Sequence, residues 1–173
     1  MLPKSFGVPE DQELTSKVNT KEGVIRFSQA VYDFCLSKGT TRKEAIITLL
    51  AVEEMGNIII EKGFNDEKNH VLELRLVRKD DELILRMRDD CALNDPMRHI
   101  SDSDDPASGM GIKMILDLAT EVAYTSSLKL NNLMIRVGLS GPDQKENTIG
   151  EQAMNKETLS ILADAISNTG SRN

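Results

Sequence analysis

The sequence contains few aromatic residues and few cysteines. Its 173 residues include no Trp, two Tyr and four Phe, so a folded core must consist mainly of Leu, Ile, Val and Met. The two cysteines, Cys35 and Cys91, form no Cys-x-x-Cys pattern, and only two His accompany them. This inventory excludes a disulfide framework and a zinc cluster, and it predicts two free thiols.

Long apolar runs and an excess of positive charge are also absent. The longest apolar stretches, such as residues 45–47 and 49–52, are far shorter than the roughly 18 residues that span a bilayer, and the initial MLPK does not begin a signal peptide. The net charge of −7 opposes binding to DNA or RNA, because phosphate binding relies on clustered Lys and Arg. We therefore expect a cytoplasmic protein without membrane insertion or nucleic-acid binding.

Apolar periodicity predicts two helices in the first third of the chain. Residues 21–37 carry apolar side chains at steps of three and four. Thr41 and Glu44 then form a Thr-x-x-Glu capping box, and an apolar-rich segment at residues 45–62 ends at Gly63. These signals define the start and the end of the second helix.

Alternating segments predict strands, and a third helix is expected at residues 111–119. A short edge strand is expected at residues 4–9, and one hairpin turns at residues 79–82 and another at residues 129–132. The alternating segments are residues 71–77, 83–88, 121–125 and 133–138. The resulting order predicts an α+β fold, a two-layer sandwich with a mostly antiparallel sheet and helices on one face.

The chain is expected to divide into a domain at residues 1–140 and a tail at residues 141–173. The tail becomes polar after Gly141, and residues 156–167 then carry an apolar stripe behind Asn155 as a helix cap. It therefore reads as a linker and a C-terminal amphipathic helix, which docks either on its own domain or on a partner.

Three segments have residues suited to a nucleotide. Residues 53–57 read EEMGN on the second helix, Asp89 stands at a strand end, and residues 109–111 form a glycine turn that opens a helix. Such a turn presents backbone N–H groups and a positive dipole to phosphate, and a carboxylate can accept a hydrogen bond from the exocyclic amine of adenine. Alone, the glycine turn is as often an ordinary turn, and Asp89 and the helix segment are more often solvated residues, but together the three predict a nucleotide site.

The helix segment also offers a base and a metal ligand. Glu53 and Asn57 are four residues apart and therefore share a helix face. A carboxylate beside phosphates could deprotonate a water or a Ser/Thr hydroxyl, while an Asn amide and phosphate oxygens could hold Mg²⁺. The alternative is a solvent-facing stripe of an amphipathic helix.

In this order the segments resemble the GHKL superfamily, with its Bergerat ATP-binding fold, over residues 24–137. The chain is most similar to the bacterial anti-sigma-factor serine/threonine kinases and related regulatory ATP-binding domains. The stretches that carry the resemblance are residues 50–57, 63–64, 85–91, 95–96, 109–115 and 130–133. The resemblance implies ATP bound between the second helix, the Asp-bearing strand end and a lid.

The resemblance also implies roles for single residues. A helix Glu would be the catalytic base, Asp89 would read adenine, and Asn57 would bind Mg²⁺. Phosphate would pass to a Ser of an anti-anti-sigma-type protein, and a sigma factor or a second copy of the chain are further implied partners. The implied ATP-binding residues are Asn57, Asp89, Cys91, Gly109, Met110, Gly111, Ile112 and Lys113.

The helix segment departs from the family pattern, in which Glu and Asn are four apart and the helix-ending Gly lies five beyond the Asn. Counting back from Gly63 puts Glu54 at the base and Ile58 at the metal position, so Asn57 is one place early. Pairing Glu53 with Asn57 instead requires an extra residue before Gly63. We favour Glu54 as the base, with Glu53 as the alternative.

Two further departures concern the surroundings of the nucleotide. Cys91 stands two residues after Asp89, where the family has Gly, and its side chain narrows the room near adenine. The lid, residues 91–108, is acidic where phosphates favour cations, and the nearest cations are Arg98 and Lys113.

Two functions remain open. The leading one is a kinase of a partner-switching circuit that transfers the γ-phosphate of ATP to a Ser of its partner. The alternative is a non-catalytic switch module, which Ile58 favours because an apolar side chain cannot ligate Mg²⁺. The catalytic domain of a sensor histidine kinase is disfavoured, because no phospho-acceptor helix precedes these segments in the sequence and His70 and His99 fall at a strand start and in the lid.

Overall fold

The computed structural model describes Pro9, residues 12–92, Asp95, Lys113, residues 115–117 and residues 119–140. Its elements lie in the unit Met1–Leu139, and the second unit, Ser140–Asn173, falls outside the described residues except for Ser140. The order is β1 (Glu13–Val18), α1 (Lys21–Ser37), α2 (Arg42–Ile58), the π-helix η2 (Ile59–Gly63), β2 (Leu72–Lys79), β3 (Glu82–Asp89), β4 (Glu121–Ser127) and β5 (Leu130–Gly138).

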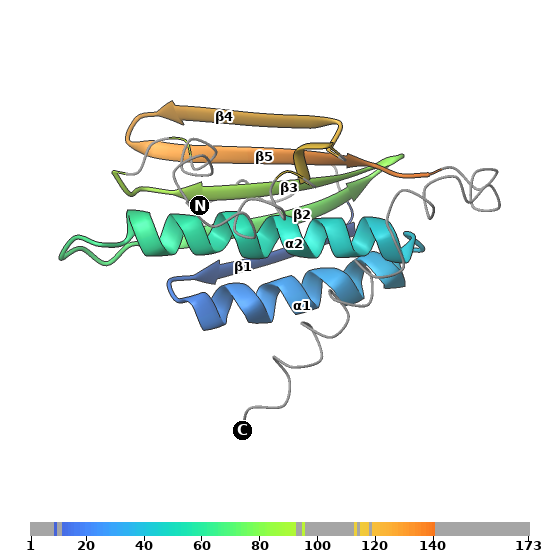
Figure 1. The fold of residues 1–173 in the computed structure, drawn as a ribbon, viewed down its shortest axis with the longest axis horizontal. Helices are drawn as coiled ribbons and strands as arrows, with labels where there is room; N and C mark the ends of the chain where they lie inside the picture. The colour runs from blue at the N-terminus through green and yellow to red at the C-terminus, as the bar shows by residue number, and fades with distance from the viewer. Residues whose placement is uncertain are drawn as a thin grey trace, which may run out of the picture. The chain divides into compact units, whose positions relative to one another are not determined.

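The strands form one sheet in the order β1-β2-β3-β5-β4, and every neighbouring pair is antiparallel. Figure 1 shows α1 and α2 side by side, and they pack on the sheet with α1 against β1 and α2 against β3 and β5. The predicted α+β fold is therefore confirmed. Among the described residues, no helix has both the length and the apolar character needed to cross a membrane.

The core between sheet and helices is aliphatic, as the scarcity of aromatic residues predicts. Strand alternation directs one set of side chains toward the helices, where burying each contributes roughly 1.5–3 kcal/mol. Both cysteines are thiols outside any disulfide, as predicted, and both are buried. The large side chains that are almost fully buried include Leu72, Leu74, Leu76, Leu83, Leu85, Met87, Leu133 and Ile135 of the strands and Met55 and Ile59 of the helical segment.

Both helix predictions are confirmed, and the second with its cap. The backbone N–H of Glu44 donates to Thr41 Oγ1 at 3.2 Å, and the N–H of Thr41 donates to Glu44 Oε2 at 2.6 Å. In α1, Thr20 Oγ1 accepts a hydrogen bond from the N–H of Gly23 at 3.1 Å. Side-chain caps of this kind compensate for the missing backbone partners at a helix start.

The sequence interpretation missed β1. Only Val18 of this edge strand is buried, so the strand lacks a clear alternation of apolar and polar residues. Antiparallel backbone pairing with β2 holds it over its whole length, and two ion pairs join the strands: Lys17 Nζ lies 2.7 Å from Glu73 Oε1, and Arg75 Nε lies 3.0 Å from Glu13 Oε1. The edge strand predicted at residues 4–9 and the tail helix at residues 156–167 lie outside the described residues, and Lys113 and residues 115–117 of the predicted third helix are helical.

The predicted turn at residues 129–132 is corrected by the structure. The β4–β5 hairpin turns at Leu128 and Lys129, and β5 already begins at Leu130. Asn favours turns in general, but here Asn131 is a buried strand residue with 6% exposure. The turn therefore uses two residues that are poorly suited to it, with φ angles of 52° and 63°.

Replacing this turn by Asn-Gly should stabilise the protein. Leu128→Asn with Lys129→Gly removes the cost of the left-handed conformation, and we expect a gain of about 1 kcal/mol in the free energy of unfolding, measured with urea. Leu128 is 93% exposed, so no packing is lost. Leu128→Ala is the control and should change stability little; a less stable Asn-Gly variant would contradict the turn assignment.

A second prediction concerns the contact between the two helices. A Cβ added to Gly56 would lie 2.8 Å from Val24 Cγ1, so Gly56 allows α1 to pack closely on α2. Gly56→Ala should destabilise the protein by roughly 1–2 kcal/mol, because overpacking outweighs the better helix propensity of Ala. Thermal unfolding would measure this, and Val24→Ala in the same chain should recover part of the loss. A Gly56→Ala chain as stable as the parent would refute the close contact.

Candidate functional site

The carboxylate of Asp89 lies at the end of β3 on the side of the sheet that faces the helices, and it is only 5% exposed. Three donors reach its Oδ1 atom: Asn131 Nδ2 at 2.8 Å, the backbone N–H of Cys91 at 3.1 Å and the Cys91 thiol at 2.9 Å. All three bonds are made to Oδ1, and among the described residues no donor bonds Oδ2. Asp89 therefore keeps one oxygen with which it can accept a hydrogen bond from a ligand.

Asn131 faces Asp89 directly in the antiparallel register of β3 and β5. Its Nδ2 donates to Asp89 and also to the backbone carbonyl of Cys91 at 2.9 Å, while its Oδ1 accepts from the hydroxyl of Tyr124 at 3.0 Å. Reversing the amide would place its oxygen against two acceptors. The hydrogen bonds therefore fix the orientation of Asn131, and through it that of Asp89.

Tyr124 is suited to remain a donor in this network. Burial raises the pKa of its hydroxyl, and the negative charge of Asp89 raises it further. The hydroxyl therefore stays protonated over the physiological range, and Asn131 Oδ1 keeps its partner.

Sequence reasoning identified Asp89 and Cys91 but gave no role to Asn131 or Tyr124. Asn131 was assigned to a turn, and Tyr124 gave no signal beyond a strand pattern. The thiol of Cys91, expected to narrow the site, is buried and also supplies a donor to Asp89. The position of Asn131 opposite the strand-end Asp in a hairpin of known register is the signal that could have found it.

The two glutamates of α2 have different surroundings. Glu53 points toward α1, where its Oε1 accepts a hydrogen bond from the Ser28 hydroxyl at 2.6 Å. Glu54 follows by one residue and so projects about 100° away around the helix. It is partly buried, and the pKa of its carboxyl is raised, first by burial and then by the negative charge of Glu53. Glu54 thus has the environment of a carboxylate poised to exchange a proton.

The helical segment after α2 accommodates an extra residue before Gly63, which the pairing of Glu53 with Asn57 requires. Residues Ile59–Gly63 form a π-helix, in which one additional residue is accommodated per turn. Asn57 precedes it, and its Oδ1 is buried without a hydrogen-bond partner among the described residues. A buried amide oxygen without a partner suits a hard cation such as Mg²⁺, whereas the neighbouring Ile58 has no atom that could bind one.

The remaining predicted site residues are only partly described. Lys113 is helical and exposed. Gly109, Met110, Gly111 and Ile112 lie outside the described residues, as does most of the predicted lid. Among the residues that the structure does describe, no three His, Cys, Asp or Glu side chains are grouped to hold a metal ion.

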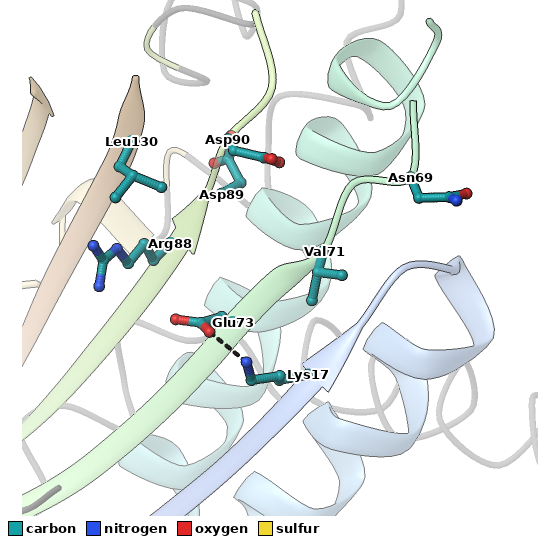
Figure 2. A pocket seen from close by; sticks show the side chains of 8 residues that line it. All are labelled: Lys17, Asn69, Val71, Glu73, Arg88, Asp89, Asp90 and Leu130. Atoms are coloured by element: carbon teal, nitrogen blue, oxygen red, sulfur yellow. Dashed lines mark ion pairs between the residues drawn. The ribbon is translucent and has the colours of Figure 1, made fainter. Parts of the chain in front are cut away.

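A pocket of about 240 Å³ lies at the same end of the sheet, and Figure 2 shows it with the helices behind the strands. The Lys17–Glu73 ion pair lies on one side of the pocket, and Arg88 and Leu130 lie on the other. Asp89 and Asp90 at the strand end also line it. The pocket shares a wall with the Asp89 site but opens on the face of the sheet that carries no helix.

Comparison with known proteins identifies the fold family. Residues 18–137 match the family described as histidine kinase-like ATPase domain, a match of well over half of the chain. No curated protein sequence matches the chain. The matched range includes Glu54, Asn57, Asp89 and Asn131, and it confirms the predicted GHKL superfamily. On this match the chain belongs to the histidine kinase-like ATPase domain family.

Proposed function

We propose that the protein is an ATP-dependent regulatory kinase of the anti-sigma-factor type, which phosphorylates a Ser of an anti-anti-sigma-type partner in the cytoplasm. The observation that carries the proposal is the arrangement on α2: Glu54 is partly buried and unengaged by Ser28, and Asn57 presents a buried oxygen without a partner among the described residues. The two residues are three apart and so share a helix face. Together they supply a base and a cation ligand.

Asp89 supports ATP as the nucleotide. With Oδ1 saturated by Asn131 and Cys91, its Oδ2 accepts a hydrogen bond from the amine of adenine. Guanine presents a carbonyl oxygen at the corresponding position, which a carboxylate repels. The fixed acceptor therefore selects adenine, and the family match supports the same nucleotide.

Glu54 would take the proton of the attacking Ser hydroxyl. A raised pKa brings the carboxylate nearer to the working pH, which makes it a better base than an ordinary surface Glu. Asn57 and phosphate oxygens would hold Mg²⁺, which supplies neutralisation of the phosphate charge when bound. Glu53 would instead keep α1 and α2 in register through Ser28.

A non-catalytic switch is the second candidate, and Ile58 is the observation that favours it. If Asn57 does not bind the cation, the helix offers no replacement at the next position, and phosphoryl transfer loses its charge neutralisation. Nucleotide binding would then only set the surface that a partner recognises.

Calorimetric titration with ATP, with and without Mg²⁺, separates these functions. The kinase proposal expects binding that strengthens with Mg²⁺ and transfer of labelled γ-phosphate to a candidate partner protein. Glu54→Gln should keep ATP binding and lower transfer by about 10²-fold or more, because the base is lost.

Glu53→Gln is the matched control, since a Gln oxygen can still accept from Ser28 and transfer should persist. Loss of transfer in Glu53→Gln but not in Glu54→Gln would assign the base to Glu53. Binding that ignores Mg²⁺ would support the switch over the kinase, and no binding of ATP would overturn both.

The role of Asp89 gives a further prediction. In Asp89→Asn the side-chain oxygen still satisfies Asn131 and Cys91, so the amide NH₂ takes the place of Oδ2 and turns an acceptor into a donor. ATP affinity should fall roughly tenfold or more in calorimetry, and GTP should lose much less. Asp81→Asn, the same change at an exposed residue of the turn before β3, should alter neither affinity. Unchanged ATP binding in Asp89→Asn would remove Asp89 as the purine reader.

A further inference from the structure

The loop between η2 and β2 contains a histidine held between two carboxylates. Nδ1 of His70 lies 2.8 Å from Asp90 Oδ1, and Nε2 lies 2.7 Å from Asp66 Oδ1. The side chain is 2% exposed, and its ring stacks on Phe64 with the centroids 5.1 Å apart. Both nitrogens of the buried ring are therefore engaged by carboxylates that themselves reach solvent.

The protonation state follows from the partners. A neutral imidazole has one N–H, whereas the imidazolium donates from both nitrogens. Ionised carboxylates only accept, and Asp66 is ionised at any ordinary pH, because hydrogen bonding from the Lys68 backbone lowers the pKa of its carboxyl to about 2. Carboxylates at both ring nitrogens therefore favour the charged form of His70.

His70 connects two walls of the candidate site. Phe64 and Asp66 directly follow η2, the end of the helical segment with Glu54 and Asn57. Asp90 directly follows Asp89, the proposed purine reader. The hydrogen bonds of the His70 ring therefore connect the loop after η2 to the residue that follows β3.

We propose that His70 is a positioning residue: its imidazolium holds Asp90, and with it Asp89, in place for ATP, and loss of its proton loosens the site and weakens nucleotide binding. This inference rests on the proposed ATP site. It assigns that site a dependence on pH that neither the fold nor the family match contains.

The charges around the His70 ring determine whether ATP binding weakens or strengthens as the pH rises. Hydrogen bonding to Asp90, and then to Asp66, raises the pKa of His70 above its ordinary value despite burial. Lys68 pairs with Asp66 at 3.2 Å, and near Asp90 the pocket contains Arg88 and the Lys17–Glu73 pair. We call the two hydrogen bonds of the charged ring, to Asp66 and Asp90, the clamp. The clamp is complete at pH values below the ordinary pKa of His, and it is lost as the pH rises through the raised pKa of His70.

The test compares ATP affinity of the full chain and of His70→Gln between pH 6 and pH 9. The affinity ratio of parent to variant should be roughly tenfold at the acid end and approach one at the alkaline end, because Gln carries no proton to lose. Using the ratio cancels the titration of the ATP terminal phosphate. Asp90→Asn should remove the same pH dependence, which keeps the test available if His70→Gln does not fold.

His99→Gln is the matched control, since the chain has one other His. It should retain the pH dependence and should also assign the His70 ring signals in a proton NMR titration, which should report a pKa above about 6.5. A constant affinity ratio, an ordinary His70 pKa, or loss of the dependence in His99→Gln would overturn the clamp while leaving ATP binding intact. No ATP binding at any pH would overturn the proposed function and the inference with it.

Discussion

The hydrogen bond between Asp89 and Asn131 is the interaction on which the site depends. A carboxylate that is 5% exposed costs several kcal/mol unless donors replace its water, and the Asn131 amide, the Cys91 N–H and the Cys91 thiol do so at one oxygen. Because these donors all bind Oδ1, the same bonds that make burial tolerable also leave Oδ2 for a ligand. The Asp89 carboxylate thus has one oxygen that is satisfied within the fold and one that is left for a ligand.

The register of β3 and β5 makes this bond possible. Because strand side chains alternate, a slip by one residue would turn Asn131 to the helix-free face and leave Asp89 without its amide donor. The register is set by Leu85 opposite Ile135 and Met87 opposite Leu133, and the two-residue turn at Leu128–Lys129 closes the adjacent hairpin at an unfavourable φ.

Local sequence signals predicted the helices, whereas features that depend on distant parts of the chain were not predicted. The capping box at Thr41 and the periodicity of residues 21–37 act within a few residues, so the sequence alone shows them. β1 depends on its pairing with β2, which is distant in the sequence, and the role of Asn131 depends on a partner 42 positions away, so neither has a local pattern. Asp89 could be proposed as a site residue from the sequence, because an Asp at the end of a predicted strand is a local feature.

The α2 segment shows how a local rule can mislead. Insertion of a residue in a helix rotates all later residues by about 100°, which counted against Asn57 when the spacing was measured from Gly63. The π-helix at Ile59–Gly63 absorbs that residue after Asn57, so the residues before it keep their α-helical positions. Spacing to the helix end therefore does not decide between Asn57 and Ile58. Of the two residues only Asn57 has an oxygen that could bind a cation. The family spacing pairs Asn57 with Glu53, but the Ser28 hydroxyl engages Glu53, which supports Glu54 as the proposed base.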